Sequence, residues 1–275
     1  MRAEPPPPAW LALVIGNSRL HWGLFIGDRW LGSWHTPHLT AVQAAGLQVA
    51  GFAPGAWPDL GLPGPGAAPP AWPPTPELWL ASVVAPQAAL LQTYPGLRPV
   101  TTAQVPLGHT YPSLGVDRAL NLLGAGVTYG WPVLVVDAGT ALTFTAGVDQ
   151  ALLGGAILPG LTLQLRSLHQ ATDQLPALPA ELTTAPPRWA TDTATAMVSG
   201  VVHTLLAGLE DFIQAWWQDY PQGQVVLTGG DAPLLLAALH RRPQAGGRPL
   251  HHDPDLMFWG LRRCRSSPWS SGAWV

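Results

Sequence analysis

The chain is poor in charge and in cysteine. Charged residues make up 11% of its 275 residues, and the net charge is −3 at pH 7. Its 13 basic residues are scattered along the chain and form no basic face, so we expect no nucleic-acid partner. Cys264 is the only cysteine. An intrachain disulfide is therefore excluded, which agrees with a reducing compartment.

Leader, membrane and common nucleotide-binding signals are also missing. The first residues, Met1 to Pro8, end in four prolines and lack the apolar centre of a signal peptide. Apolar runs such as Trp131 to Ala138 fall far short of the ~20 residues that span a membrane. We therefore expect a cytoplasmic protein without membrane contact. The P-loop and the Gly-x-Gly-x-x-Gly fingerprint are absent, so those two nucleotide-binding folds lose their main support.

What the chain does have is apolar material, 47% of its residues, in short runs divided by turns. Three runs close together at the start predict a β-meander, and helical spacing predicts two longer helices. Pro and Gly in residues 52–76 predict a surface loop, and His251-His252-Asp253 is interpreted as a strand end and not as a metal site. Strands are expected at 11–15, 20–26, 30–34, 78–84, 133–136 and 225–227, and helices at 117–128, at 194–217 and after Asp231.

Two of the predicted hairpins resemble each other. Gly16 and Gly139 each stand in a turn between two strands, are followed by a small polar residue, and are 123 residues apart. Hairpins in general look alike, so this similarity alone leaves an internal duplication open. The residues that make up the two turns favour an internal duplication.

Both turns carry groups that suit phosphate. Glycine lets backbone N–H groups approach an anion closely, and Gly16-Asn17-Ser18 and Gly139-Thr140 add amide or hydroxyl side chains. Asp137 ends an apolar strand, where a carboxylate either binds a cation or caps the turn. Thr228-Gly-Gly-Asp231 is a further strand-to-helix turn, which alone is weak support for a nucleotide site.

A second polar group opens the predicted helix at residue 117. Asp117 at a helix start is by default a cap. Together with Arg118 it also offers a base and a rigid fork for a substrate carboxylate. Both interpretations stay open on the residues alone.

Taken together and in order, these motifs resemble the type III pantothenate kinases. The resemblance covers roughly residues 11 to 261, and no single motif carries it. The matching segments are Ile15-Gly-Asn-Ser-Arg19, Ala81-Ser-Val-Val84 with Pro86, Leu114-Gly-Val-Asp-Arg118, Val136-Asp-Ala-Gly-Thr-Ala-Leu-Thr143, Gly154-Gly-Ala-Ile-Leu-Pro-Gly160, Asp192-Thr193 with Ser199-Gly200, and Leu227-Thr-Gly-Gly-Asp-Ala232.

The resemblance implies an α/β protein with the duplicated ribonuclease-H-like fold of actin-like ATPases and sugar kinases, two lobes with a central cleft. We place the lobes at residues 9–129 and 130–264, with flexible tails at 1–8 and 265–275. It also implies phosphorylation of pantothenate to 4'-phosphopantothenate, the first step of coenzyme A biosynthesis, by a homodimer. The implied cofactors are ATP, Mg²⁺ and a monovalent cation, K⁺ or NH₄⁺.

Site residues follow by position in the family's motifs. Asp117 would be the catalytic base, and Asp137 would bind the monovalent cation. Thr193 would reach the substrate across the dimer interface. The ATP-binding residues would be Val14, Ile15, Gly16, Asn17, Ser18, Arg19, Leu20, His21 and Thr140, and the pantothenate-binding residues Tyr111, Gly115, Val116, Asp117, Arg118 and Thr193.

The chain departs from the family at two acidic positions. Val14 stands where the family usually has Asp, and Thr145 stands where it often has another Asp. The first departure removes a charge that helps to organise metal and phosphates. It motivates an alternative, a catalytically weakened or silent dimeric homologue with a regulatory or binding role. A third possibility is a related kinase or phosphatase acting on another small hydroxyl compound.

Overall fold

The computed structural model describes residues 7–66, 69, 71–178, 182, 184–242 and 248–267. The chain divides into two compact units, residues 1–124 with 257–275 and residues 125–256. The lobes placed from sequence at 9–129 and 130–264 stay a prediction, as do the flexible tails. Most of the two tails, 1–6 and 268–275, lies outside the described residues.

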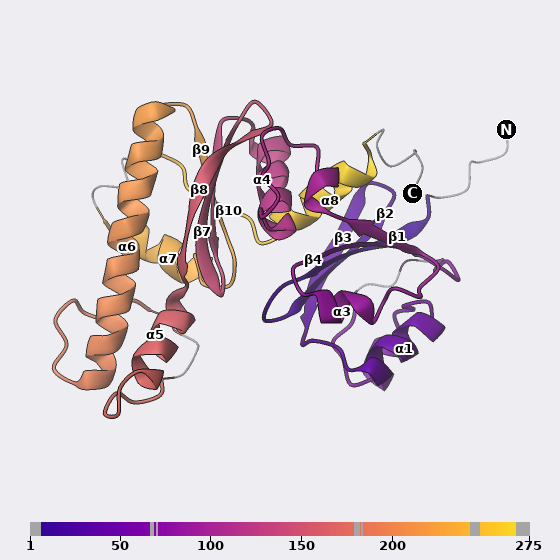
Figure 1. The fold of residues 1–275 in the computed structure, drawn as a ribbon, viewed down its shortest axis with the longest axis horizontal. Helices are drawn as coiled ribbons and strands as arrows, with labels where there is room; N and C mark the ends of the chain where they lie inside the picture. The colour runs from indigo at the N-terminus through magenta and orange to yellow at the C-terminus, as the bar shows by residue number, and fades with distance from the viewer. Residues whose placement is uncertain are drawn as a thin grey trace. The chain divides into compact units, whose positions relative to one another are not determined.

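The first unit is built on a five-stranded mixed sheet in the order β3-β2-β1-β4-β5 (Figure 1). The meander is confirmed, since β1–β2 and β2–β3 pair antiparallel, while β1–β4 and β4–β5 pair parallel. The strands are β1 (Ala9–Ile15), β2 (Leu20–Ile26), β3 (Arg29–Thr36), β4 (Glu77–Ser82) and β5 (Leu97–Val100).

Helices of this unit pack their apolar residues on the sheet. α1 (Ala41–Val49) begins at a capping box in which Thr40 and Gln43 bond each other's backbone. The interval 52–76, predicted as a loop, contains α2 (Ala56–Asp59), so that part of the prediction is wrong. Trp57 lies on α2, is fully buried and packs on Trp22, so its burial outweighs the Pro and Gly around it. The other helices are α3 (Ala85–Ala89), α4 (Val116–Tyr129), which runs on into the second unit, α8 (Leu256–Arg265), and the 3₁₀ turn η1 (Thr102–Gln104).

The second unit has its own five-stranded sheet, in the order β10-β9-β6-β7-β8. β6–β7 and β7–β8 pair antiparallel, and β6–β9 and β9–β10 pair parallel. In Figure 1 the long helix α6 runs beside this sheet, with α5 next to it. The elements are β6 (Val133–Ala138), β7 (Ala141–Val148), β8 (Ala151–Pro159), α5 (Leu161–Gln170), α6 (Thr193–Asp219), β9 (Gln224–Thr228), α7 (Ala232–Leu239) and β10 (His251–His252).

α6 confirms the predicted amphipathic helix and is the central helix of this core. By length and composition alone it could cross a membrane. In the folded chain it buries 44% of its most apolar window, and side chains such as Val202 and Leu209 pack against the sheet. We interpret it as a core helix. Its buried residues are Met197, Ser199, Val201, Val202, Leu205, Leu206, Leu209, Ile213 and Trp216.

The two sheets have the same topology. If each unit's strands are numbered in chain order, both sheets read 3-2-1-4-5, with the same pattern of parallel and antiparallel pairs. Gly16 and Gly139 follow the first strand of each unit, so the similarity of the two hairpins reflects an internal duplication. The same offset of 123 residues places Val14 and Asp137 at equivalent positions, one residue before each first strand ends.

Candidate functional site

The first glycine turn joins β1 to β2 and spans residues 16–19. Gly16 N–H donates to the Arg19 carbonyl at 3.0 Å, which closes the turn, and Asn17, Ser18 and Arg19 are exposed. Val14, Ile15 and Leu20 flank it and are at most 1% exposed. Their side chains belong to the core, so only their backbone could contact a nucleotide. The polar groups available at this turn come from residues 16–19 and from His21.

His21 is the half-buried side chain next to this turn. It lies edge-on to His35, with ring centroids 4.7 Å apart. Burial is the main cause that lowers the pKa of His21 to about 4, and His35 and the Arg19 guanidinium lower it further. Burial and Arg19 also lower the pKa of His35. Both rings are therefore neutral at pH 7, and Arg19 supplies the positive charge beside the turn.

Five of the six predicted substrate residues, all except Thr193, lie at or just before the start of α4. Asp117 Oδ1 accepts from the Arg118 N–H at 2.8 Å, and an added Cβ on Gly115 would lie 2.4 Å from the same oxygen. Gly115 is therefore required for this carboxylate position. Arg118 Nη1 donates to the Tyr111 hydroxyl at 3.1 Å, and Val116 is buried. This hydrogen bond uses Oδ1, so Oδ2 is the oxygen that we expect to accept a proton.

In the second unit, Asp137 lies at the end of β6 between two glycine turns. Its Oδ1 is 3.4 Å from the Cβ position of Gly139 and 2.6 Å from that of Gly229, whose φ is +90°. Gly229 therefore leaves room for the carboxylate and takes a conformation that favours glycine. In register, Asp137 pairs with Thr143 on β7 and with Thr228 on β9, so the three side chains share one face of the sheet.

The Asp137 cluster also contains an unsatisfied oxygen. Thr228 is 1% exposed, and its Oγ1 has no hydrogen-bond partner among the described residues. Carboxylate and hydroxyl oxygens are ligands that hard cations accept. The described residues contain no group of three or more His, Cys, Asp or Glu side chains placed to hold a metal ion. A cation here would thus need donors such as Asp137, Thr228, backbone carbonyls, phosphate or water.

The second glycine turn is held by a contact from the end of β8. Gly160 N–H donates to the Thr140 carbonyl at 3.0 Å, and Gly139 N–H donates to the Ala141 carbonyl at 3.1 Å. Thr140 is exposed, so its hydroxyl is accessible at the turn. The sequence motif 154–160 included Gly160 but gave no sign that it supports residues 139 and 140.

Thr193 is the first residue of α6 and is exposed. Asp192 precedes it and accepts from the Thr195 N–H at 2.9 Å. This backbone hydrogen bond is the main cause that lowers the pKa of Asp192. The cap fixes where α6 begins and hence where Thr193 is presented.

Comparison with known proteins assigns the chain to a family. A profile of the family described as type III pantothenate kinase matches residues 10–215. This chain belongs to that family. A type III pantothenate kinase from Nostoc sp. strain PCC 7120 is 46% identical over 266 residues, covering 92% of this chain and 93% of the relative. Another from Synechococcus sp. strain JA-3-3Ab is 42% identical over 258 residues, covering 93% and 92% of the two chains.

A solved structure shares the fold at low identity. A Baf family protein from Campylobacter jejuni aligns with a TM-score of 0.59 at 18% identity, over 93% of this chain and 96% of that one. This similarity supports the fold alone. The resemblance to type III pantothenate kinases read from the sequence is confirmed by the family profile and by the relatives.

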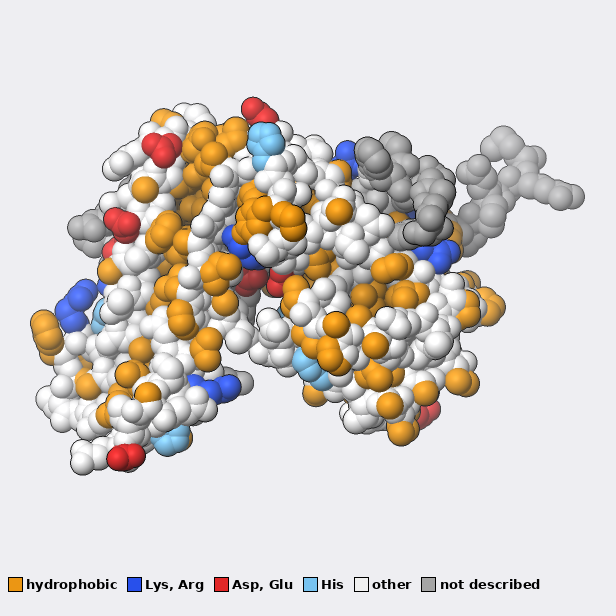
Figure 2. Space-filling view, viewed as in Figure 1, with side chains coloured by type: hydrophobic (Ala, Val, Ile, Leu, Met, Phe, Trp, Pro, Cys, Tyr) orange, Lys and Arg blue, Asp and Glu red, His pale blue; other side chains and the backbone are white. Residues whose placement is uncertain are grey.

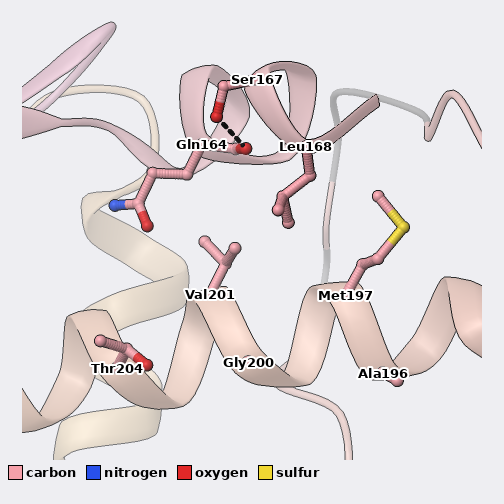
Figure 3. Close-up of a pocket in the computed structure, with 8 residues that line it drawn as sticks. All are labelled: Gln164, Ser167, Leu168, Ala196, Met197, Gly200, Val201 and Thr204. Carbon is pink, nitrogen blue, oxygen red and sulfur yellow. Dashed lines mark hydrogen bonds between the residues drawn. The ribbon is translucent and has the colours of Figure 1, made fainter. Parts of the chain in front are cut away.

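A hollow of about 360 Å³ between α5 and α6 does not coincide with the predicted site (Figure 3). Gln164 and Leu168 of α5 face Met197 and Val201 of α6 across it. No site residue predicted from the sequence lines it, although Thr193 lies one helical turn before its first α6 residue, Ala196. Gln164, Ser167 and Thr204 give this hollow polar groups, but none of its lining residues carries the charge that transfer of a phosphate needs.

Proposed function

We propose that this chain transfers the γ-phosphoryl group of ATP to the primary hydroxyl of pantothenate, giving 4'-phosphopantothenate for coenzyme A biosynthesis. The observation that carries the proposal is membership of the type III pantothenate kinase family over most of the chain. The local geometry within each unit supports it. Each unit places a glycine turn directly after its first strand, polar groups suited to phosphate lie at these turns, and Asp137 lies beside the second one.

Asp117 is the proposed general base. Because Arg118 N–H holds Oδ1, Oδ2 is presented to the substrate hydroxyl and accepts its proton as the oxygen–phosphorus bond forms. The Arg118 guanidinium, oriented by the Tyr111 hydroxyl, pairs with the pantothenate carboxylate. Thr193 is proposed to contact the same substrate from a second subunit of a homodimer.

The turns at 16–19 and 139–140 are proposed to bind the phosphates of ATP through their N–H groups and through Asn17, Ser18 and Thr140. The chain contains no lysine, so arginine is its only permanently positive side chain. We therefore propose that catalysis also uses Mg²⁺ and a monovalent cation, K⁺ or NH₄⁺, the latter at Asp137. The half-buried carboxylate and the unsatisfied Thr228 hydroxyl fit such an ion. When bound, the cations would neutralise phosphate charge.

The homodimer and a cytoplasmic location are part of the same proposal. Exposed apolar side chains on the second unit, Leu153 and Ile157 of β8 and Phe212 of α6, support self-association. Charged groups on the face drawn in Figure 2 are small and scattered, which gives no support for a nucleic-acid partner. Sedimentation or light scattering gives the mass, and a monomer at micromolar concentration would contradict the dimer.

One observation favours the second candidate, a catalytically weakened or silent homologue. Val14 occupies the position equivalent to Asp137 and is 1% exposed, so the first unit presents a core side chain where the second presents a carboxylate. A protein of this kind would keep the fold and bind its ligands in a regulatory role.

The deciding experiment is a coupled ADP-release assay with ATP, Mg²⁺, pantothenate and K⁺, with product identified by mass spectrometry. The kinase proposal expects pantothenate-dependent ADP release and a product heavier by one phosphoryl group. Na⁺ in place of K⁺ tests the monovalent-cation requirement. Binding of nucleotide without product at saturating ATP would instead support the silent homologue.

A further inference from the structure

The turn at residues 16–19 has a contact that no family motif above includes. His38 lies in the segment between β3 and α1, 22 residues from Gly16 in the sequence. Its Nε2 is 2.9 Å from the Gly16 carbonyl oxygen. Because a carbonyl only accepts, Nε2 carries the hydrogen and donates it. The side chain of His38 thus bonds directly to the backbone of the proposed phosphate-binding turn.

His38 is itself held by a fixed support. Gln87, on α3, accepts from the Leu39 N–H at 2.9 Å and donates to the Leu39 carbonyl at 3.2 Å. Leu39 is 4% exposed and packs in the core of the first unit. Two hydrogen bonds and a buried side chain therefore fix the residue next to His38, which limits the freedom of its ring.

The strands below the turn are also joined. Val83 N–H donates to the Ile15 carbonyl at 3.1 Å, and the Ser82 hydroxyl bonds the backbone of Val84. The end of β1, the β4–α3 connection and the segment around His38 are therefore linked by hydrogen bonds within one unit. These hydrogen bonds fix the backbone around His38 while its ring bonds the Gly16 carbonyl.

The direction of the Gly16 carbonyl determines the direction of a phosphate donor. In a trans peptide the carbonyl oxygen of one residue and the N–H of the next lie in one plane and point in opposite directions across the C–N bond. When His38 holds the Gly16 oxygen on one side, the Asn17 N–H must point to the other. Asn17 is exposed, and we expect this N–H to be within reach of an anion at the turn.

We propose that His38 is a positioning residue for nucleotide binding, which orients the Gly16–Asn17 peptide so that the Asn17 N–H faces the phosphates of ATP. This inference rests on the proposed function but concerns nucleotide affinity and not the chemical step. His38 does not touch the nucleotide. It reduces the conformational freedom that the turn would otherwise lose on binding.

The test compares His38→Phe, which keeps the ring and loses the N–H donor, with His38→Gln, which keeps a donor. Isothermal titration with a non-hydrolysable ATP analogue and Mg²⁺ gives the dissociation constant directly. His38→Phe should weaken binding about 3- to 10-fold, the range for one net hydrogen bond. His38→Gln should retain most of the wild-type affinity for the analogue. In the kinase assay the KM for ATP should rise while the KM for pantothenate stays unchanged.

Controls separate positioning from a general structural effect. His252→Phe alters an exposed histidine on β10 of the other unit and should change neither constant. If His38→Phe does not fold, Gln87→Leu removes the support of Leu39 and should weaken analogue binding in the same direction. Unchanged analogue affinity in folded His38→Phe would overturn the inference, as would equal rises in both KM values. If the wild-type protein binds the analogue tightly but has no kinase activity, only the proposed function is contradicted. If it does not bind the analogue at all, both the proposed function and the role of His38 are contradicted.

Discussion

Gly160 is the residue where a single methyl group should do most damage to the second glycine turn. An added Cβ would lie 2.1 Å from the Gly139 carbonyl oxygen and 2.8 Å from the Thr140 carbonyl oxygen. Both are backbone atoms and cannot rotate away as a side chain could. Because ordinary contacts begin near 3.4 Å, Gly160→Ala requires the turn at 139–140 to move by roughly 1 Å. The hydrogen bond from Gly160 N–H to the Thr140 carbonyl would be distorted at the same time.

The expected magnitude follows from these contacts. Overpacking of this kind costs about 1–3 kcal/mol of folding free energy. For a protein of this size that corresponds to a fall in Tm of roughly 2–10 °C. Since the turn is the proposed ATP contact, a displacement of about 1 Å should also lower kcat/KM for ATP by on the order of 10- to 100-fold.

The assay pairs thermal denaturation with steady-state kinetics, and Gly208→Ala is the matched control. Gly208 lies in α6 of the same unit and has nothing within 4 Å of its Cβ position. Alanine there should leave activity unchanged and raise stability by about 0.5–1 kcal/mol, because glycine disfavours helix interiors. Wild-type Tm and wild-type kcat/KM in Gly160→Ala would refute the reasoning. A loss of stability with full activity would instead show that the turn is not part of the ATP site.

Three further predictions concern ionisable positions in or near the site. Asp117→Asn should lower kcat by ~10²–10⁴-fold with nucleotide affinity retained, and near-normal turnover in the coupled assay would remove Asp117 from the mechanism. Val14→Asp buries a carboxylate at a position that is 1% exposed, so Tm should fall; an unchanged Tm would contradict this. The pKa of His21, about 4 when folded against 6.5 for an ordinary histidine, means that the unfolded chain binds the proton more readily. Stability should therefore fall from about pH 6.5 to pH 4, by on the order of 3 kcal/mol, and His21→Gln should flatten the denaturation profile over that range.

The sequence predicted best those elements whose own pattern determines them. The meander and the strands at 133–136 and 225–227 have clear apolar runs, the helix at 194–217 has clear apolar periodicity, and the structure confirms each. β10 confirms the strand predicted at His251-His252. In these segments the apolar side chains that form the pattern are the ones that become the core.

Elements were missed where tertiary contacts decide the structure. β5 is only four residues long and contains Pro99, and α2 contains Pro58, so local propensity opposes both. β5 forms because it pairs with β4, and α2 forms where Trp57 is buried. Neither the parallel partner of a short strand nor the burial of one tryptophan can be read from neighbouring residues.

The same limit applies to the candidate site. Its contiguous parts, Gly16-Asn17-Ser18 and Gly115 to Arg118, were found because residues close in sequence make their own local geometry. His38 and Gly160 were not assigned roles, since each acts on a turn at least 20 residues away through a single hydrogen bond or a close backbone approach. Such contacts produce no periodicity and no motif in the sequence, because each involves only one atom of the residue.

The internal duplication allows the surroundings of Val14 to be compared with those of Asp137. Val14 and Asp137 hold equivalent positions, each one residue before the end of the first strand of its unit. Because the two sheets share one topology, Val14 has a neighbour on β2 and one on β4, and Asp137 has a neighbour on β7 and one on β9. Around Asp137 those neighbours are Thr143 and Thr228, which offer hydroxyls, whereas around Val14 they are His21 and Ala81. The neighbours of Val14 on β2 and β4 therefore differ from those of Asp137, and a neutral, half-buried His21 is compatible with an apolar residue beside it. Restoring a carboxylate at residue 14 alone would therefore place it among groups unsuited to a cation, which is why we expect Val14→Asp to cost stability before it contributes anything to catalysis.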